Sequence, residues 1–157
     1  MKILGIDPGL ADLGFGVINK TGNKLTMIDY GCVKTKAGQN LEKRLVEINN
    51  SLEQLIKIHR PGIISIEELF FCKNLKTAIA VGEARGVVLL VAGKHQIEIA
   101  EFTPMQIKLA LTSYGKASKT QVKQMVKNVL NLKELPKSDD AADALAAAIC
   151  CANSLKK

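Results

Sequence analysis

Three consecutive apolar segments at the N-terminus, with no helix between them, are the feature that most constrains the fold of this chain. The run Lys2–Asp7 (KILGID) ends in Asp-Pro-Gly, which is typical of a strand followed by a turn. Two further segments, Gly14–Asn19 and Lys24–Lys34, flank a Lys-Thr-Gly-Asn turn, and this pattern predicts an antiparallel hairpin. We therefore expect the chain to open with three successive strands.

Helical and strand-like segments alternate in the rest of the chain. Apolar residues recur at helical spacing in Leu41–His59, and Leu75–His95 is also expected to be helical. The short runs Ile63–Glu67 and Ile97–Phe102 are typical of strands, the first buried on both faces. After the last strand we expect three helices, one beginning at Thr103-Pro104, one over Gln121–Leu132 and one over Asp140–Ser154.

The resulting order, βββαβαβααα, predicts an α/β fold, namely a ribonuclease-H-like mixed five-stranded sheet flanked by helices. A single domain over residues 1–157 is expected, because this length is usual for one domain and 47% apolar residues are enough for a full core. Nucleases, transposases and sugar-kinase-like ATPases share this fold, so the fold does not decide the function.

Charge and cysteine content narrow the classes of protein to consider. A net charge of +7 is compatible with a phosphate-rich partner. The four cysteines form no Cys-x-x-Cys pair and there are only two histidines, so we expect no zinc site and a reduced, cytoplasmic protein. No apolar run approaches the ~20 residues of a membrane helix and no signal segment is evident, so we expect no membrane partner.

Four carboxylates stand where this topology would bring them together. Asp7 ends the first strand, and Glu67 ends a strand that should lie beside it. Asp140 and Asp143 are three residues apart at the start of the last helix, so they share a face, with Cβ atoms about 5–6 Å apart. Taken singly, each has a common structural explanation as a turn residue, a solvated strand end or a helix-capping acid. Their joint placement indicates a site.

Phosphodiester hydrolysis would explain why carboxylates gather in a basic chain. The phosphate is anionic and gains negative charge during the reaction, so carboxylates alone would repel it. Carboxylates that hold two Mg²⁺ ions about 3.5–4 Å apart reverse the local sign, activate water and stabilise the leaving oxygen. Mg²⁺ keeps several waters, so three or four carboxylates suffice. Without metal, the cluster is self-repelling and one or more of its pKa values should be raised.

Several sequence blocks together resemble the RuvC family of crossover junction endodeoxyribonucleases, which are Holliday junction resolvases. In chain order the blocks are residues 3–9 (ILGIDPG) with 14–16 (GFG), 66–74 (IEELFFCKN), 82–86 (GEARG) and 140–146 (DAADALA). The resemblance implies an Mg²⁺-dependent endonuclease, with two ions per subunit and with Mn²⁺ able to substitute. Such an enzyme makes symmetric nicks in opposed strands of four-way DNA junctions during recombination and repair.

The resemblance also implies which carboxylates carry the chemistry. Catalysis and metal binding fall to Asp7, Glu67, Asp140 and Asp143. The alignment of the blocks selects Glu67 over Glu68, and Asp140 over Asp139. Relatives can carry another type of ligand at the position of Asp143.

Four further residues are implied to contact DNA. Lys108 and Lys119, the latter in the basic loop 115–120, would lie near phosphates, although such lysines are usually only solvated. Phe70 would stack on a junction base, a contact worth ~1–3 kcal/mol; the alternative is a core or dimer contact. Arg85 would contact phosphate, or pack around Gly82 and Gly86, two glycines whose spacing would allow close helix packing.

The family further implies assembly partners. A symmetric homodimer would match the two-fold symmetry of the junction, and we expect the helix containing Gly82 and Gly86 to form its interface. The RuvA–RuvB branch-migration complex is a further implied partner.

Three alternatives remain open on the sequence alone. A sugar-kinase or actin-like ATPase also has Asp-x-Gly after its first strand, but it needs a second similar domain, and no Walker A motif is present. Another ribonuclease-H-like nuclease, acting on RNA–DNA hybrids or other structured DNA, would use the same metal chemistry. A non-catalytic DNA-binding module would use the carboxylates only as caps and turns.

Overall fold

The structure, a computed structural model, describes residues 1–68 and 75–155, with the backbone alone for residues 75–77. In these residues five strands form one sheet in the order β3-β2-β1-β4-β5. β1 (Lys2–Asp7), β2 (Asp12–Thr21) and β3 (Lys24–Lys34) are antiparallel neighbours. β4 (Ile63–Glu67) runs parallel to β1, and β5 (Glu98–Phe102) runs parallel to β4. The predicted mixed five-stranded sheet is confirmed.

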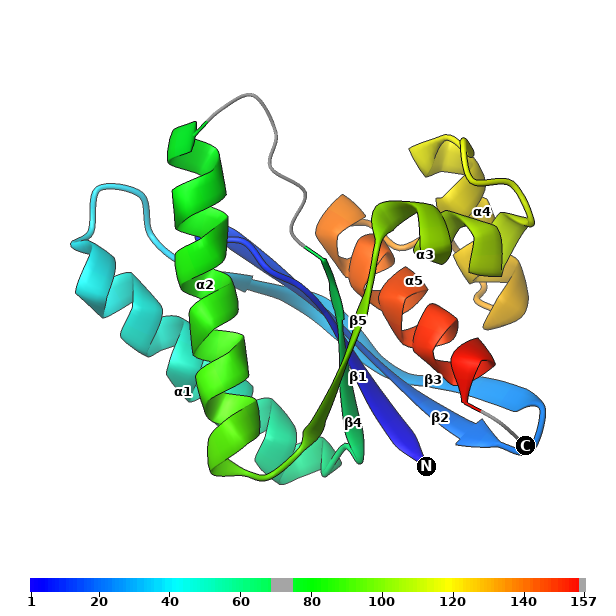
Figure 1. The fold of residues 1–157 in the computed structure, drawn as a ribbon, viewed down its shortest axis with the longest axis horizontal. Helices are drawn as coiled ribbons and strands as arrows, with labels where there is room; N and C mark the ends of the chain where they lie inside the picture. Colours follow the sequence, from blue (N-terminus) through cyan, green and yellow to red (C-terminus); the bar gives the residue numbers. More distant parts are fainter. Residues whose placement is uncertain (69–74, 156–157) are drawn as a thin grey trace.

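Helices cover both faces of this sheet (Figure 1). α1 (Leu41–His59) and α2 (Leu75–Lys94) pack on one face. α3 (Pro104–Thr112), α4 (Lys119–Val129) and α5 (Asp139–Ser154) pack on the other. Within the described residues, no helix combines the length and the apolar character needed to cross a bilayer.

The predicted element order is confirmed, and the differences lie at element ends. β2 is longer than the predicted Gly14–Asn19 and has a register shift at Val17/Ile18. α4 begins at Lys119 rather than at Gln121, because Ser118 and Gln121 form a reciprocal capping box. Lys119 is therefore the first residue of a helix, and its prediction as a loop residue was wrong.

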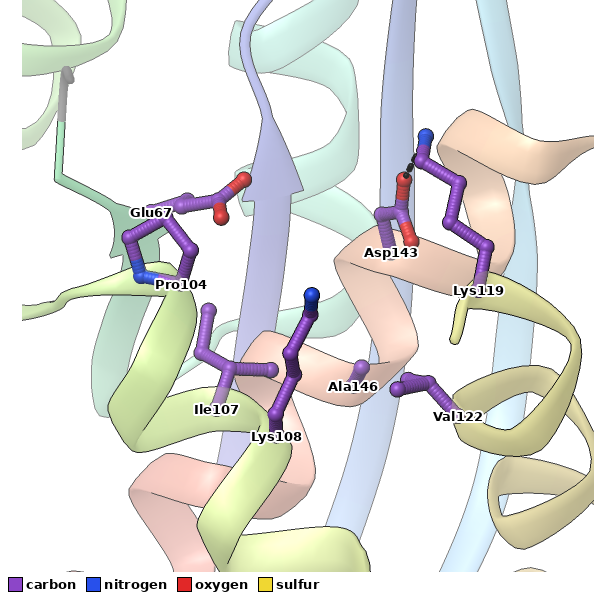
Figure 2. A pocket seen from close by; sticks show the side chains of 8 residues that line it. All are labelled: Glu67, Pro104, Ile107, Lys108, Lys119, Val122, Asp143 and Ala146. Carbon is purple, nitrogen blue, oxygen red and sulfur yellow. Dashed lines mark hydrogen bonds and ion pairs between the residues drawn. The ribbon is translucent and has the colours of Figure 1, made fainter. Parts of the chain in front are cut away.

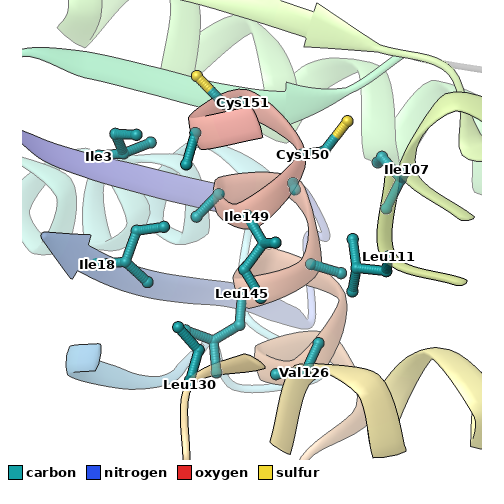
Figure 3. Packing of buried hydrophobic residues seen from close by; sticks show 14 of the residues in the cluster. Ile3, Ile18, Ile107, Leu111, Val126, Leu130, Leu145, Ile149, Cys150 and Cys151 are labelled. Carbon is teal, nitrogen blue, oxygen red and sulfur yellow. The ribbon is translucent and has the colours of Figure 1, made fainter. Parts of the chain in front are cut away.

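Alternation along β1 directs its side chains to the two faces in turn. Leu4 and Ile6 are buried against α1 and α2, whereas Ile3 packs with α5 (Figure 3). Gly5 and Asp7 share the face of Ile3, so both are directed towards α5. The same alternation in β4 places Ser65 and Glu67 on the α5 face.

α5 lies directly against the sheet because three glycines at the contact carry no side chain. A Cβ atom on Gly5 would lie 1.9 Å from the carbonyl oxygen of Ala144, and one on Gly14 would lie 2.1 Å from that of Asp140. A Cβ on Gly16 would lie 2.7 Å from the side chain of Leu145. Glycine inside a strand commonly marks such a close backbone approach. The acidic start of α5 is thereby held beside the end of β1 and the beginning of β2.

Polar contacts fix α5 along its length. The Ser65 hydroxyl donates a hydrogen bond of 2.8 Å to the carbonyl oxygen of Ala147. Ser138 caps the N-terminus of the helix, and its Oγ lies 2.8 Å from Cys32 Sγ on β3. At the C-terminus, Lys20 Nζ donates to the carbonyl oxygen of Ala152 over 2.5 Å. These contacts set the position of the helix along the sheet as well as its distance from it.

The close helix packing predicted at Gly82 and Gly86 is not found among the residues that the structure describes. A Cβ atom on either glycine would meet nothing within 4 Å. These glycines instead leave part of the α2 surface open.

We expect Gly5→Ala to destabilise the fold by about 1–3 kcal/mol or more, because the added methyl group overlaps the backbone of α5. Gly93→Ala is the matched control, since its Cβ meets nothing within 4 Å, and it should stabilise α2 by about 1 kcal/mol. Urea unfolding followed by circular dichroism measures both changes. Equal stability of the two variants would contradict the direct contact between helix and sheet.

Candidate active site

The predicted carboxylates come from β1, β4 and α5 and gather at one edge of the sheet. Asp7 and Glu67 are the last residues of two adjacent parallel strands, whose preceding residues Ile6 and Ile66 are paired. Asp7 is paired across the sheet with Gly14, the glycine that contacts the backbone of Asp140. Asp7 therefore lies between the end of β4 and the first turn of α5.

A cavity of about 200 Å³ opens beside these carboxylates. Figure 2 shows Glu67 and Asp143 on opposite sides of it, with Lys108 from α3 and Lys119 from α4 extending to the same space. The remaining lining is mostly apolar and comes from the helices on the α5 face: Pro104, Ile107, Val122 and Ala146. The cavity thus combines carboxylates and ammonium groups with an otherwise apolar lining.

The pKa values of the carboxylates show that the groups act on one another. Burial, followed by the negative charges of Asp143, Glu67 and Asp140, raises the pKa of Asp7 to about 7. Burial and then Asp143 raise the pKa of Glu67, against the opposing charges of Lys119 and Lys108. Burial also raises the pKa of Asp143, although its partner Lys119 acts in the other direction. The predicted self-repulsion of a metal-free cluster is therefore present.

Asp143 and Asp139 form two neighbouring ion pairs, each with a different lysine. Lys119 Nζ lies 3.2 Å from Asp143 Oδ2, within the cavity. Lys123 Nζ lies 2.8 Å from Asp139 Oδ1 and holds the pKa of that exposed carboxyl below its usual value. Asp139 therefore already has a cationic partner. Asp7, Asp139 and Asp140 are not among the residues that line the cavity, whose carboxylates are Glu67 and Asp143.

The donor set fits a hard divalent cation, since carboxylate oxygens are the ligands that Mg²⁺ and Mn²⁺ take. Among the residues that the structure describes, no three Asp, Glu, His or Cys side chains stand close enough together to hold one ion as they are placed. Asp143 is turned to Lys119 instead. Closing a ligand shell thus requires side-chain rotation, while the strands and α5 already bring the carboxylates to one place.

One predicted DNA contact is not at this cavity, and another cannot be compared with it. Arg85 lies on α2, which packs on the opposite face of the sheet from α5, and forms an ion pair with Glu101 of β5. Its Nε is buried and has no hydrogen-bond partner within the described residues. Phe70 lies outside the described residues.

Sequence reasoning missed the residues that place the cluster. Gly5, Gly14 and Gly16 act by having no side chain, and Ser138 with Cys32 fixes the start of the acidic helix. One signal was available: three glycines inside predicted strands, where glycine is unfavourable unless another backbone approaches closely.

This fold and its lysine-flanked carboxylate cavity define a ribonuclease-H-like nuclease. A family model described as "Crossover junction endodeoxyribonuclease RuvC" matches residues 3–151. The chain belongs to this family, and the predicted resemblance is confirmed.

Individual relatives agree with this assignment. A RuvC of Ruminiclostridium cellulolyticum is 53% identical over 98% of this chain and 93% of its own length. One from Caldanaerobacter subterraneus is 51% identical over the same shares. The solved structure of Thermus thermophilus RuvC in complex with a Holliday junction substrate has a TM-score of 0.90 and 36% identity, covering 96% of this chain and 92% of that one. Family membership decides against the ATPase and against the non-catalytic module.

We expect the metal-free protein to lose stability as the pH rises from about 4 to about 7. The folded state binds the proton of Asp7 more tightly than the unfolded state does, because its pKa is raised from 3.8 to about 7, so stability is greatest below this window. Asp7→Asn should flatten the dependence and should make the protein more stable than the parent above this window. Thermal unfolding in the presence of a chelator, between about pH 4 and about pH 7, measures this pH dependence. Asp139→Asn is the control at an exposed carboxyl. If the stability of Asp7→Asn depended on pH as strongly as that of the parent, the raised pKa of Asp7 would not be its cause.

Proposed function

We propose that this chain resolves Holliday junctions by cation-dependent hydrolysis of one phosphodiester in each of two opposed strands. The observation that carries the proposal is a cavity lined by Glu67, Asp143, Lys108 and Lys119, beside Asp7, whose pKa is raised in part by the charges of both carboxylates. The T. thermophilus relative, whose structure was solved with a Holliday junction substrate, supports the choice of four-way DNA over RNA–DNA hybrids.

Asp7, Glu67, Asp140 and Asp143 would hold the cations, with Mg²⁺ as the resident ion and Mn²⁺ as a substitute. When bound, a pair of such ions activates water and stabilises the leaving oxygen. Asp7 is the central ligand in this proposal, since its pKa responds to all three of the other carboxylates. Its proton must leave when a cation binds, so metal affinity should rise with pH.

Lys108 and Lys119 would hold the phosphate at the cavity. Both line it and both are cationic. Neither lysine can replace the cations, because an ammonium group neither activates water nor supplies several coordination positions. Their role is to attract the strand and to orient the scissile phosphate towards the carboxylates. The contacts predicted for Phe70 and Arg85 stay predictions; an Arg85–phosphate contact would have to replace its ion pair with Glu101.

A two-fold homodimer would place two such sites on opposed strands. The exposed surface of α2 is suited to form the interface, because Ile79 and Leu90 are 54% and 61% exposed and Gly82 and Gly86 leave room beside them. Contiguous exposed apolar surface commonly marks an interaction site. Joining the α2 helices of two copies would cover these side chains.

Two further assignments accompany this proposal. We place the activity in the cytoplasm, where the thiols of Cys32, Cys150 and Cys151 would stay reduced. Contact with RuvA–RuvB stays a prediction.

We expect Asp7→Asn, Glu67→Gln and Asp140→Asn each to bind a synthetic four-way junction but to lose cutting by about 10²-fold or more, as is usual when a group that stabilises transition-state charge is removed. The matched controls are the adjacent acids: Glu68→Gln and Asp139→Asn should cut at close to the parent rate. A nicking assay with Mg²⁺ titration, on the junction and on linear duplex, measures these rates. If cutting were lost in the controls but not in the variants, the adjacent acids would be the catalytic residues instead.

Leu90→Glu should convert the protein to monomers, because it places a charge in the proposed interface. Ile58→Glu is the control, since Ile58 is 69% exposed on α1, outside that surface. Sedimentation velocity reports the oligomeric state of both. Dimers of Leu90→Glu, or monomers of the parent protein, would count against the α2 interface.

A further inference from the structure

Lys119 and Asp143 form an ion pair in the lining of the cavity. Lys119 is the first residue of α4, and Asp143 lies near the start of α5. The ammonium nitrogen is 3.2 Å from a carboxylate oxygen of Asp143 (Figure 2). An ammonium group therefore stands at one of the oxygens that would coordinate a divalent ion.

Lys119 acts on more of the cluster than this one contact indicates. Its positive charge lowers the pKa values of Asp7, Glu67 and Asp143, opposing the rise that burial and mutual repulsion cause. Lys108, the other lysine of the cavity, acts in this way on Glu67. Lys119 is thus a shared counter-charge for the three carboxylates.

The contact is placed so that it can be broken. The backbone of Lys119 is fixed by the capping box of Ser118 and Gln121, but its side chain is 76% exposed. Exposed ion pairs are weak, because water screens the charges and long side chains lose rotamer freedom when they pair. A divalent ion carries twice the charge of an ammonium group, and it can bind several carboxylates at once.

We propose that Lys119 is a displaceable counter-cation: its ammonium group occupies Asp143 while no divalent ion is bound, and cation binding releases it to a DNA phosphate. This inference rests on the proposed cation site. It adds that Lys119 competes with the cation in the free protein and supports the reaction once DNA is bound. Because linkage is reciprocal, a phosphate that accepts Lys119 should strengthen cation binding, and a bound cation should strengthen DNA binding.

Calorimetric titration of the DNA-free, full-length protein with Mn²⁺ tests the competition. Lys119→Met should bind Mn²⁺ about fivefold more tightly than the parent, which is what losing an exposed ion pair would release. Lys119→Arg keeps the charge and should bind like the parent. Lys123→Met is the matched control, because it removes the same charge from the neighbouring pair with Asp139 and should leave the affinity close to that of the parent.

The outcomes separate the inference from the proposed function. If the parent protein binds no Mn²⁺, the cation site and the inference fall together. If the parent binds Mn²⁺ and Lys119→Met binds it equally or more weakly, the inference alone is overturned. Equal tightening in Lys119→Met and Lys123→Met would also overturn it, since net charge rather than competition would then explain the effect.

The displacement itself has a direct readout. The ¹⁵N signal of the Lys119 ammonium group, assigned by its absence in Lys119→Met, should shift during an Mg²⁺ titration with the midpoint of cation binding. A signal that stays unchanged while Mg²⁺ saturates the protein would overturn the inference. This measurement needs no cutting activity, so it also holds for a variant that is inactive for other reasons.

Discussion

The direct contact between α5 and the sheet is the constraint on which the site depends. Strands β1 and β2 present glycine where the helix crosses them, and the facing helix is rich in alanine, so the two backbones meet with little side-chain volume between them. Glycine is unfavourable in strands, but an alanine-rich helix loses little side-chain entropy when it is buried. The buried side chains of the same face, seen in Figure 3, then close around the helix. Asp140 and Asp143 reach the strand ends because the helix lies this close to the sheet.

The electrostatic cost of the site follows from the same contact. Bringing carboxylates from three elements into a partly buried space raises the pKa values of Asp7, Glu67 and Asp143, that of Asp7 to about 7. A fold selected only for stability would separate such charges or replace them. Lys119 and Lys108 offset part of the repulsion, but neither is buried in the cluster. The remaining repulsion is free energy that a cation can release on binding, so the strain of the metal-free site and its affinity for cations have one cause.

The sequence was sufficient for the element order, because periodicity and turns mark each strand and helix, and for the adjacency of β1 and β4, which the topology dictates. The choice of Glu67 over Glu68 came from family resemblance, and the structure supplies its physical reason: Glu67 alternates with Ser65 onto the α5 face, whereas Glu68 is exposed. The Lys119–Asp143 pair was beyond sequence reasoning, since it depends on the distance between two helix starts far apart in the chain. The same holds for the glycine contact, whose partner atoms belong to a segment more than a hundred residues away.

The charge arrangement also bears on why a basic protein would cut only where DNA is properly seated. Its net charge of +7 attracts DNA generally, but the cavity itself gathers carboxylates and would repel a phosphate while no cation is bound. Attraction over the surface and repulsion at the cavity are therefore separate properties of the same chain. In the proposed function, cations would reverse the sign only at the carboxylates, and a phosphate would then become a favourable neighbour for Lys108 and Lys119. Binding could thus occur at many places along DNA, whereas cutting would require cation and phosphate at one position together.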